Sequence, residues 1–111
     1  MNVVTDKCPV IGLDQEFPDH LFVVCLEDVG QYGCCAVAVG RKYVHCLMVF
    51  EREPAAVAFG QYLTDSCEGL GDASIKKVTF NQAREIAKGR PLPICGMALG
   101  DSEAVIIHYV R

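Results

Sequence analysis

The sequence predicts an α+β domain, with a mixed or antiparallel sheet of five to six strands and two helices packed on one face. Short apolar runs bounded by Gly, Pro and Asp are typical of strands. Two other segments have apolar residues at helical spacing. The chain has 111 residues and is 51% hydrophobic, which suits one domain with a sizeable core. The expected order of elements is β-β-β-α-β-α-β-β.

The chain is expected to divide into an irregular N-terminal arm, residues 1–19, and a single domain, residues 20–111. The arm contains Pro9 and Pro18, and its apolar side chains are isolated. Three of them, Ile11, Leu13 and Phe17, are candidates for packing onto the domain.

Three strands are predicted at the start of the domain. They cover His20–Glu27, Gly33–Val39 and Tyr43–Glu51, and short glycine-containing turns separate them. Such spacing is typical of an antiparallel meander.

The first helix is predicted to begin near Pro54, because proline has no N–H to lose at the first helical position. Its inward residues at helical spacing are Ala55, Phe59, Tyr62 and Leu63. A strand over residues 74–78 is expected to follow.

The second helix has a clearer start signal. Thr79 and Gln82 form the pattern of a capping box, in which each side chain accepts a hydrogen bond from the other residue's backbone N–H. Gly89 and Pro91 end the helix. Two last strands are predicted, over Ile94–Leu99 and Ala104–Val110.

Side chains alternate between the two faces of a sheet, so the first three strands define two faces. A turn over residues 28–31 would place Cys25 opposite Cys34, and a turn at Gly40 would place Cys35 opposite Cys46. The expected core face, beneath the helices, carries Phe22, Val24, Leu26, Cys35, Val37, Val39, Val44, Cys46, Met48 and Phe50. The second face carries Val23, Cys25, Cys34, Ala36, Ala38, His45 and Leu47, rimmed by Glu27, Tyr43 and Glu51.

The second face is the predicted functional surface, because two helices on the first face would leave it uncovered. An exposed apolar area of several hundred Å2 commonly marks an interface. Closed two-fold dimers are the commonest assembly, so homodimerisation is the first hypothesis. The candidate interface residues are Val23, Ala36, Ala38, Tyr43 and Leu47. Alternatively, the N-terminal arm covers this face with its apolar side chains.

Seven cysteines are present, and none belongs to a C-x-x-C pair. The alternative hypothesis is a small-molecule or metal-binding module that uses Cys25, Cys34 and His45. Structural zinc sites need four convergent ligands, whereas adjacent residues on a strand diverge. We therefore expect the cysteines to be packing residues, with no metal or other cofactor.

Catalysis has little support in the sequence. No cysteine lies at a predicted helix start, where its pKa would fall. We name no catalytic residue and expect a non-enzymatic domain. A third hypothesis is an enzyme with a pocket between the first helix and the sheet, using Tyr62, Cys67 or His108.

Charge and hydropathy restrict the partners. The net charge is −4, and a nucleic-acid binder needs a basic face. The basic clusters, Lys76-Lys77 among them, are interpreted as solvated charges. No apolar stretch approaches the roughly 18–20 residues of a membrane span. The N-terminus lacks a signal-peptide pattern, so a cytoplasmic location with reduced thiols is expected. The expected partner is a second copy or another protein.

Overall fold

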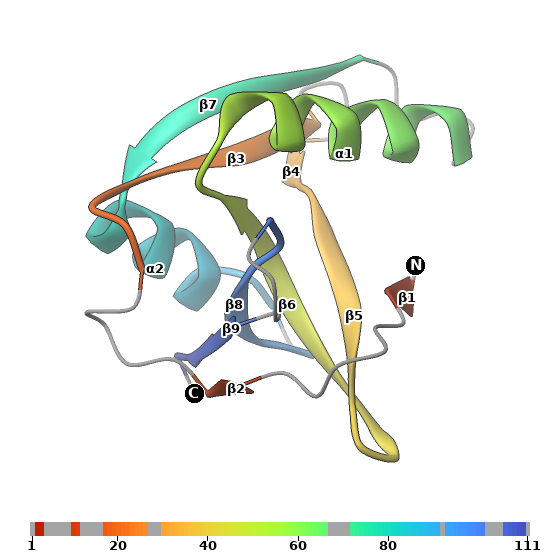
Figure 1. The fold of residues 1–111 in the computed structure, drawn as a ribbon, viewed down its shortest axis with the longest axis vertical. Helices are drawn as coiled ribbons and strands as arrows, with labels where there is room; N and C mark the ends of the chain where they lie inside the picture. The colour runs from red at the N-terminus through yellow and green to blue at the C-terminus, as the bar shows by residue number, and fades with distance from the viewer. Residues whose placement is uncertain are drawn as a thin grey trace.

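A computed structural model describes residues 2–3, 10–11, 17–26, 30–66, 72–91, 93–101 and 106–110 (Figure 1). In chain order its elements are β1 (Asn2–Val3), β2 (Val10–Ile11), β3 (His20–Leu26), β4 (Gln31–Tyr32), β5 (Cys34–Val39), β6 (Lys42–Phe50), α1 (Glu53–Ser66), β7 (Ala73–Thr79), α2 (Phe80–Lys88), β8 (Ile94–Leu99) and β9 (Ile106–Tyr109). Neither described helix has the length and apolarity needed to cross a membrane.

The prediction of an α+β domain with a mixed sheet and two helices is confirmed. The number of strands differs, because the described residues form nine strands in place of five or six. Three of them, β1, β2 and β4, have only two residues. Such short pairings depend on which segments meet in space and leave no pattern in the sequence. Two of the three lie in the segment expected to be irregular.

The sheet runs in the order β1-β5-β6-β8-β9-β2, and β3 joins it at the end of β6. The neighbours β6 and β8 are parallel, whereas β5 and β6 are antiparallel. A parallel pair requires a long crossover connection. Here the crossover contains α1, β7 and α2, and it places β7 on the outer side of β3.

Gly33 lies between β4, which pairs with β3, and β5, which pairs with β6. Its N–H donates to the Val24 carbonyl at 2.8 Å, and its own carbonyl accepts from the Met48 N–H at 3.1 Å. A Cβ at this position would lie 2.9 Å from a ring carbon of Phe59 in α1. Glycine therefore lets two strands and a helix meet at one point.

The change of pairing partner at Gly33 makes the predicted register of Cys25 and Cys34 wrong. Cys25 pairs with Tyr32, not with Cys34, and Cys34 pairs with Leu47 of β6. The predicted pair of Cys35 and Cys46 is confirmed. The second turn has Gly40 with φ +62°, at the first central position of a two-residue hairpin loop. A glycine there is typical of a type II′ turn.

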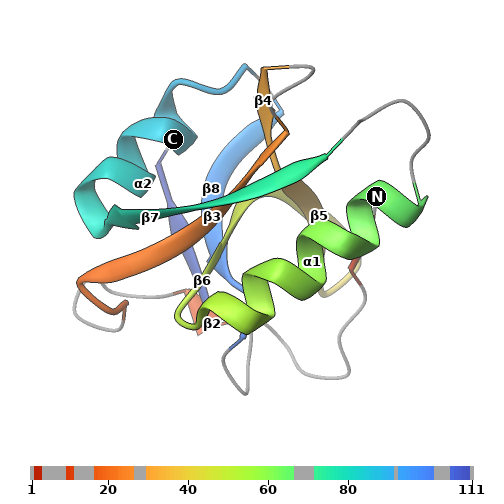
Figure 2. The ribbon, with the colours of Figure 1, turned by 90° about the horizontal axis from the view of Figure 1, so that it is seen from above.

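The two predicted sheet faces are confirmed, because a shift of two residues preserves the alternation of side chains. The first face packs with Ala56 and Leu63 of α1. The second packs with Ala83 and Ala87 of α2. The prediction that both helices lie on one face is therefore wrong, and Figure 2 shows them on opposite sides of the β3–β7 pair. Both faces are apolar, so each is buried by a helix of its own.

Candidate binding site at the edge of the sheet

Strand β7 is an edge of the sheet. All seven of its residues pair with β3, from Ala73 opposite Leu26 to Thr79 opposite His20. No described residue pairs with its other side. Figure 1 shows β7 at the outer margin of the molecule. An unpaired edge of this length is a template for a further strand.

Three hydrogen bonds show which backbone groups of β7 point outward. The Phe80 N–H donates to the backbone carbonyl of Asp19, one residue beyond the β3–β7 ladder. The Val24 carbonyl, in register with Ile75, accepts from Gly33 on the opposite side of β3. The Thr79 N–H donates to the Gln82 side chain.

Hydrogen-bonding direction alternates along an antiparallel pair. The odd-numbered residues of β7 therefore direct their N–H and C=O groups away from β3. Thr79 uses its N–H in the capping box, which leaves the outward groups of Ala73, Ile75 and Lys77. These groups make no hydrogen bond within the part of the chain that the structure describes. They are the hydrogen-bonding edge of the candidate site.

A hollow lies beside β7 on its α1 face and has a volume of about 310 Å3. Two segments line it. From α1 come Val57, Gly60, Gln61 and Thr64, and from β7 and the residue before it come Asp72, Ala73 and Ile75. Gly60 permits this close approach, because a Cβ there would lie 3.2 Å from the Ala73 side chain.

A second hollow, of about 380 Å3, lies beside β7 on its α2 face. Its apolar floor includes the buried Val78 and the half-buried Ile86 and Tyr32. Its polar rim includes Lys76 and Glu85, both exposed. A neighbouring hollow shares Tyr32 and Lys76 with it and reaches Cys25. Apolar lining with a few polar groups is the usual composition of a binding site.

The capping box predicted for α2 is confirmed and closes one end of the edge. Gln82 donates its N–H to the Thr79 hydroxyl at 3.1 Å, and the Thr79 N–H donates to Gln82 Oε1 at 2.9 Å. These bonds stop the strand and start the helix in consecutive residues. They also fix α2 beside β7, which forms the second hollow.

Arg90 packs against Tyr32, which lines the second hollow. Its guanidinium carbon is 5.5 Å from the centre of the Tyr32 ring, a cation–π distance. Burial raises the pKa of the Cys34 thiol to about 11, although the positive charge of Arg90 acts in the opposite direction. Cys34 therefore stays protonated at neutral pH, which disfavours it as a nucleophile or metal ligand.

No protein family, curated protein or solved structure gives a significant match to this chain. Function is therefore inferred from the site itself.

The structure places the predicted interface residues in two groups. Val23 and Leu47 are fully buried on the α2 face, and Ala36 is 3% exposed. Ala38 and Tyr43 lie opposite each other near the end of the β5–β6 hairpin, where Tyr43 is 51% exposed. The buried Phe17 of the N-terminal arm also packs on this face, whereas Leu13 lies outside the described residues.

The structure brings two of the three predicted binding residues together. Cys25 and Cys34 are half-buried and pack against the same core cluster as Tyr32. His45 is half-buried on β6, opposite Ala36. Among the described residues, no three His, Cys, Asp or Glu side chains gather where they would hold a metal ion.

The residues suggested for an enzyme pocket are also separated. Tyr62 is half exposed on α1 and does not line the hollow beside that helix. The His108 ring packs against two others, with its centroid 6.1 Å from that of Phe17 and 5.3 Å from that of Phe80, and these two are 5.5 Å apart. Cys67 lies outside the described residues.

Lys76 and Lys77 belong to the candidate site, although the sequence pattern predicts only solvated charges there. Their sequence signal is a pair of adjacent lysines within the strand ASIKKVT. Lysine within a strand is typical of an exposed edge.

Proposed function

We propose that this protein is a small non-enzymatic interaction domain that binds an extended segment of a partner protein as an added strand along β7. The observation that carries this proposal is the outward row of backbone groups at Ala73, Ile75 and Lys77, with a hollow on each side. In strand addition, main-chain hydrogen bonds supply affinity and pockets for alternate side chains supply specificity.

The two hollows suit the alternation of an incoming strand. Successive side chains of a strand point to opposite faces, so one set would enter the hollow beside α1 and the other the hollow beside α2. Val78 and Ile86 in the hollow beside α2 favour an apolar side chain. The hollow beside α1 offers Val57 and Ile75 next to polar residues.

The test is selection of short peptides from a random library displayed on phage, followed by affinity measurements against two variants. Lys77→Pro removes the outward N–H without removing a bond to β3. Lys77→Gln removes only the charge. We expect selected peptides to lose about tenfold in affinity with Lys77→Pro, and less than about threefold with Lys77→Gln.

A second measurement leaves the protein unchanged, so that a folding defect in Lys77→Pro cannot explain its result. Each selected peptide is N-methylated at successive positions, and strand addition predicts that alternate positions abolish binding. Equal tolerance at every position would contradict the proposal. So would a library that yields no binder with an affinity better than about 1 mM.

A second candidate function is homodimerisation through the part of the second sheet face that α2 does not cover. The observation in its favour is Tyr43, 51% exposed beside the half-buried Ala38 and near His45. Sedimentation velocity at increasing protein concentration tests it. A dimer that dissociates on Tyr43→Lys supports this candidate, and a monomer at about 100 µM rules it out.

A further inference from the structure

We infer that the segment accepted by β7 is acidic, with two adjacent carboxylate residues flanked by apolar ones. This inference rests on the proposed function and specifies the chemistry of the partner. Its basis is the pair Lys76 and Lys77, in the middle of the free edge. One lysine is on each face of the sheet.

Across the described β3–β7 ladder, the two lysines face no acidic residue. In the ladder with β3, Lys76 lies opposite Val23 and Lys77 lies opposite Phe22. Both lysines are exposed, and neither forms an ion pair within the described part of the chain. Two positive charges therefore remain available on a molecule whose net charge is −4.

An added strand would place two adjacent residues directly opposite these lysines. Because neighbouring side chains alternate, one would meet Lys76 on the α2 face and the other Lys77 on the α1 face. Opposite charges in directly facing positions stabilise a pair of strands, and like charges destabilise it. Carboxylates at both positions therefore complement the edge.

The carboxylates that already line the hollows do not neutralise this pair. Asp72 precedes β7 and is four residues from Lys76 along the chain, roughly 13 Å in a strand. Glu85 lines the α2 hollow with Lys76, but its Oε1 lies 3.9 Å from Nη1 of Arg84.

Apolar residues at the flanking positions fit the apolar members of each hollow. The partner residue opposite Val78 would lie beside Val78 and Ile86. The residue opposite Ile75 would lie beside Ile75 and Val57, in a hollow that also has polar lining residues. The inferred core, apolar–acidic–acidic–apolar, reads the same in both directions.

A second copy of this chain fits the same edge poorly. Pairing β7 with itself would bring four lysines to one interface, where like charges repel. An acidic partner strand neutralises them instead.

The experiment compares three capped, threonine-flanked peptides by fluorescence anisotropy. Their cores are Val-Glu-Glu-Val, Val-Gln-Gln-Val and Val-Lys-Lys-Val. We expect the glutamate peptide to bind about fivefold more tightly than the glutamine peptide and more than about tenfold more tightly than the lysine peptide. The double variant Lys76→Glu/Lys77→Glu should reverse the preference, so that the lysine peptide binds best.

The outcomes separate the two proposals. If all three peptides bind equally and Lys77→Pro weakens each of them, strand addition stands and the acidic preference is overturned. If the glutamate peptide binds Lys77→Pro and Lys77→Gln equally, loss of the outward N–H has no effect beyond loss of the charge; its binding is then electrostatic only, and strand addition is overturned. If none of the three binds while the library yields binders of other sequence, the acidic preference alone is overturned. A β7–β7 dimer detected by sedimentation and abolished by Lys77→Pro would replace the acidic partner with a second copy.

Discussion

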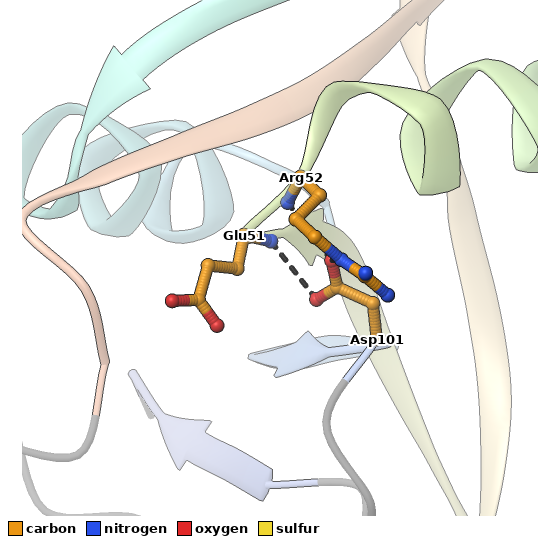
Figure 3. Close-up of polar contacts among 3 residues, drawn as sticks. All are labelled: Glu51, Arg52 and Asp101. Atoms are coloured by element: carbon orange, nitrogen blue, oxygen red, sulfur yellow. Dashed lines mark hydrogen bonds and ion pairs between the residues drawn. The ribbon is translucent and has the colours of Figure 1, made fainter.

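The carboxylate of Asp101 accepts a hydrogen bond from the backbone N–H of Glu51 at 2.9 Å (Figure 3). Its other oxygen accepts one from the N–H of Arg52, also at 2.9 Å. The Asp101 side chain is 5% exposed, whereas the two donor residues are exposed. The two hydrogen bonds connect Asp101, which follows β8, to the two residues before α1. This helix forms one wall of the candidate site.

Replacing Asp101 is expected to destabilise the fold. Asp101→Asn removes the charge and one of the two acceptor oxygens, and hydrogen bonds to a charged group contribute about 1.5–3 kcal/mol each. We expect a loss of about 2 kcal/mol in the free energy of unfolding, measured by guanidinium denaturation. The matched control is Glu51→Gln, on an exposed residue, with an expected change below about 0.5 kcal/mol. Equal effects of the two variants would show that the Asp101 carboxylate has no special role.

Hydrogen exchange should reveal the free edge directly. The N–H groups of Lys76 and Val78 point toward β3 and should be protected, whereas those of Ile75 and Lys77 point outward and should exchange faster. Amide exchange followed by NMR in the isolated protein measures this alternation. Uniform protection along β7 would mean that its outer side is already occupied.

Gly33→Ala is expected to destabilise the protein at the junction of β4 and β5. The new Cβ would lie 2.9 Å from Cε2 of Phe59 and 3.1 Å from Cδ1 of Leu63. Overpacking of this kind costs about 1–3 kcal/mol. Thermal and chemical unfolding measure the loss.

A double-variant cycle tests its cause. Phe59→Leu removes the nearest ring atom, so Gly33→Ala should cost less in that background. If the cost is the same in both backgrounds, the loss arises from the backbone at residue 33 and not from the contact with Phe59.

The buried thiols should make stability fall at alkaline pH. Burial raises the pKa of Cys35 and that of Cys46 from about 9 to about 12. Between these values the unfolded thiols ionise while the folded ones keep their protons, so the unfolded state is favoured as pH rises. For the two thiols together we expect a loss of about 2–3 kcal/mol between pH 8 and pH 10.

The control for this prediction is Cys35→Ala/Cys46→Ala, compared by its pH dependence and not by its absolute stability. The alanine protein should lose less stability over the same pH range in denaturant unfolding. Identical pH dependence in both proteins would contradict the thiol assignment, because lysines and tyrosines common to both would then explain the loss.

Local chemistry explains what could be predicted from the sequence. The Thr79–Gln82 capping box is a contact between near neighbours, and Gly40 sets a two-residue turn that brings Cys35 opposite Cys46. The candidate site could not be predicted in the same way. Its residues come from β4, α1, β7 and α2, and no local pattern tells that β7 lies on the outside of β3.

The sequence by itself determined the α+β class, the long strands and helices, and the two faces of the first three strands. Propensity, capping and side-chain alternation act over a few residues and survive an error of two in register. Only the tertiary structure decided that α1 and α2 cover opposite faces and that β7 is an edge. It also decided that the chain changes its pairing partner from β3 to β6 at Gly33. These depend on contacts between distant segments, which form where both sheet faces must be buried at once.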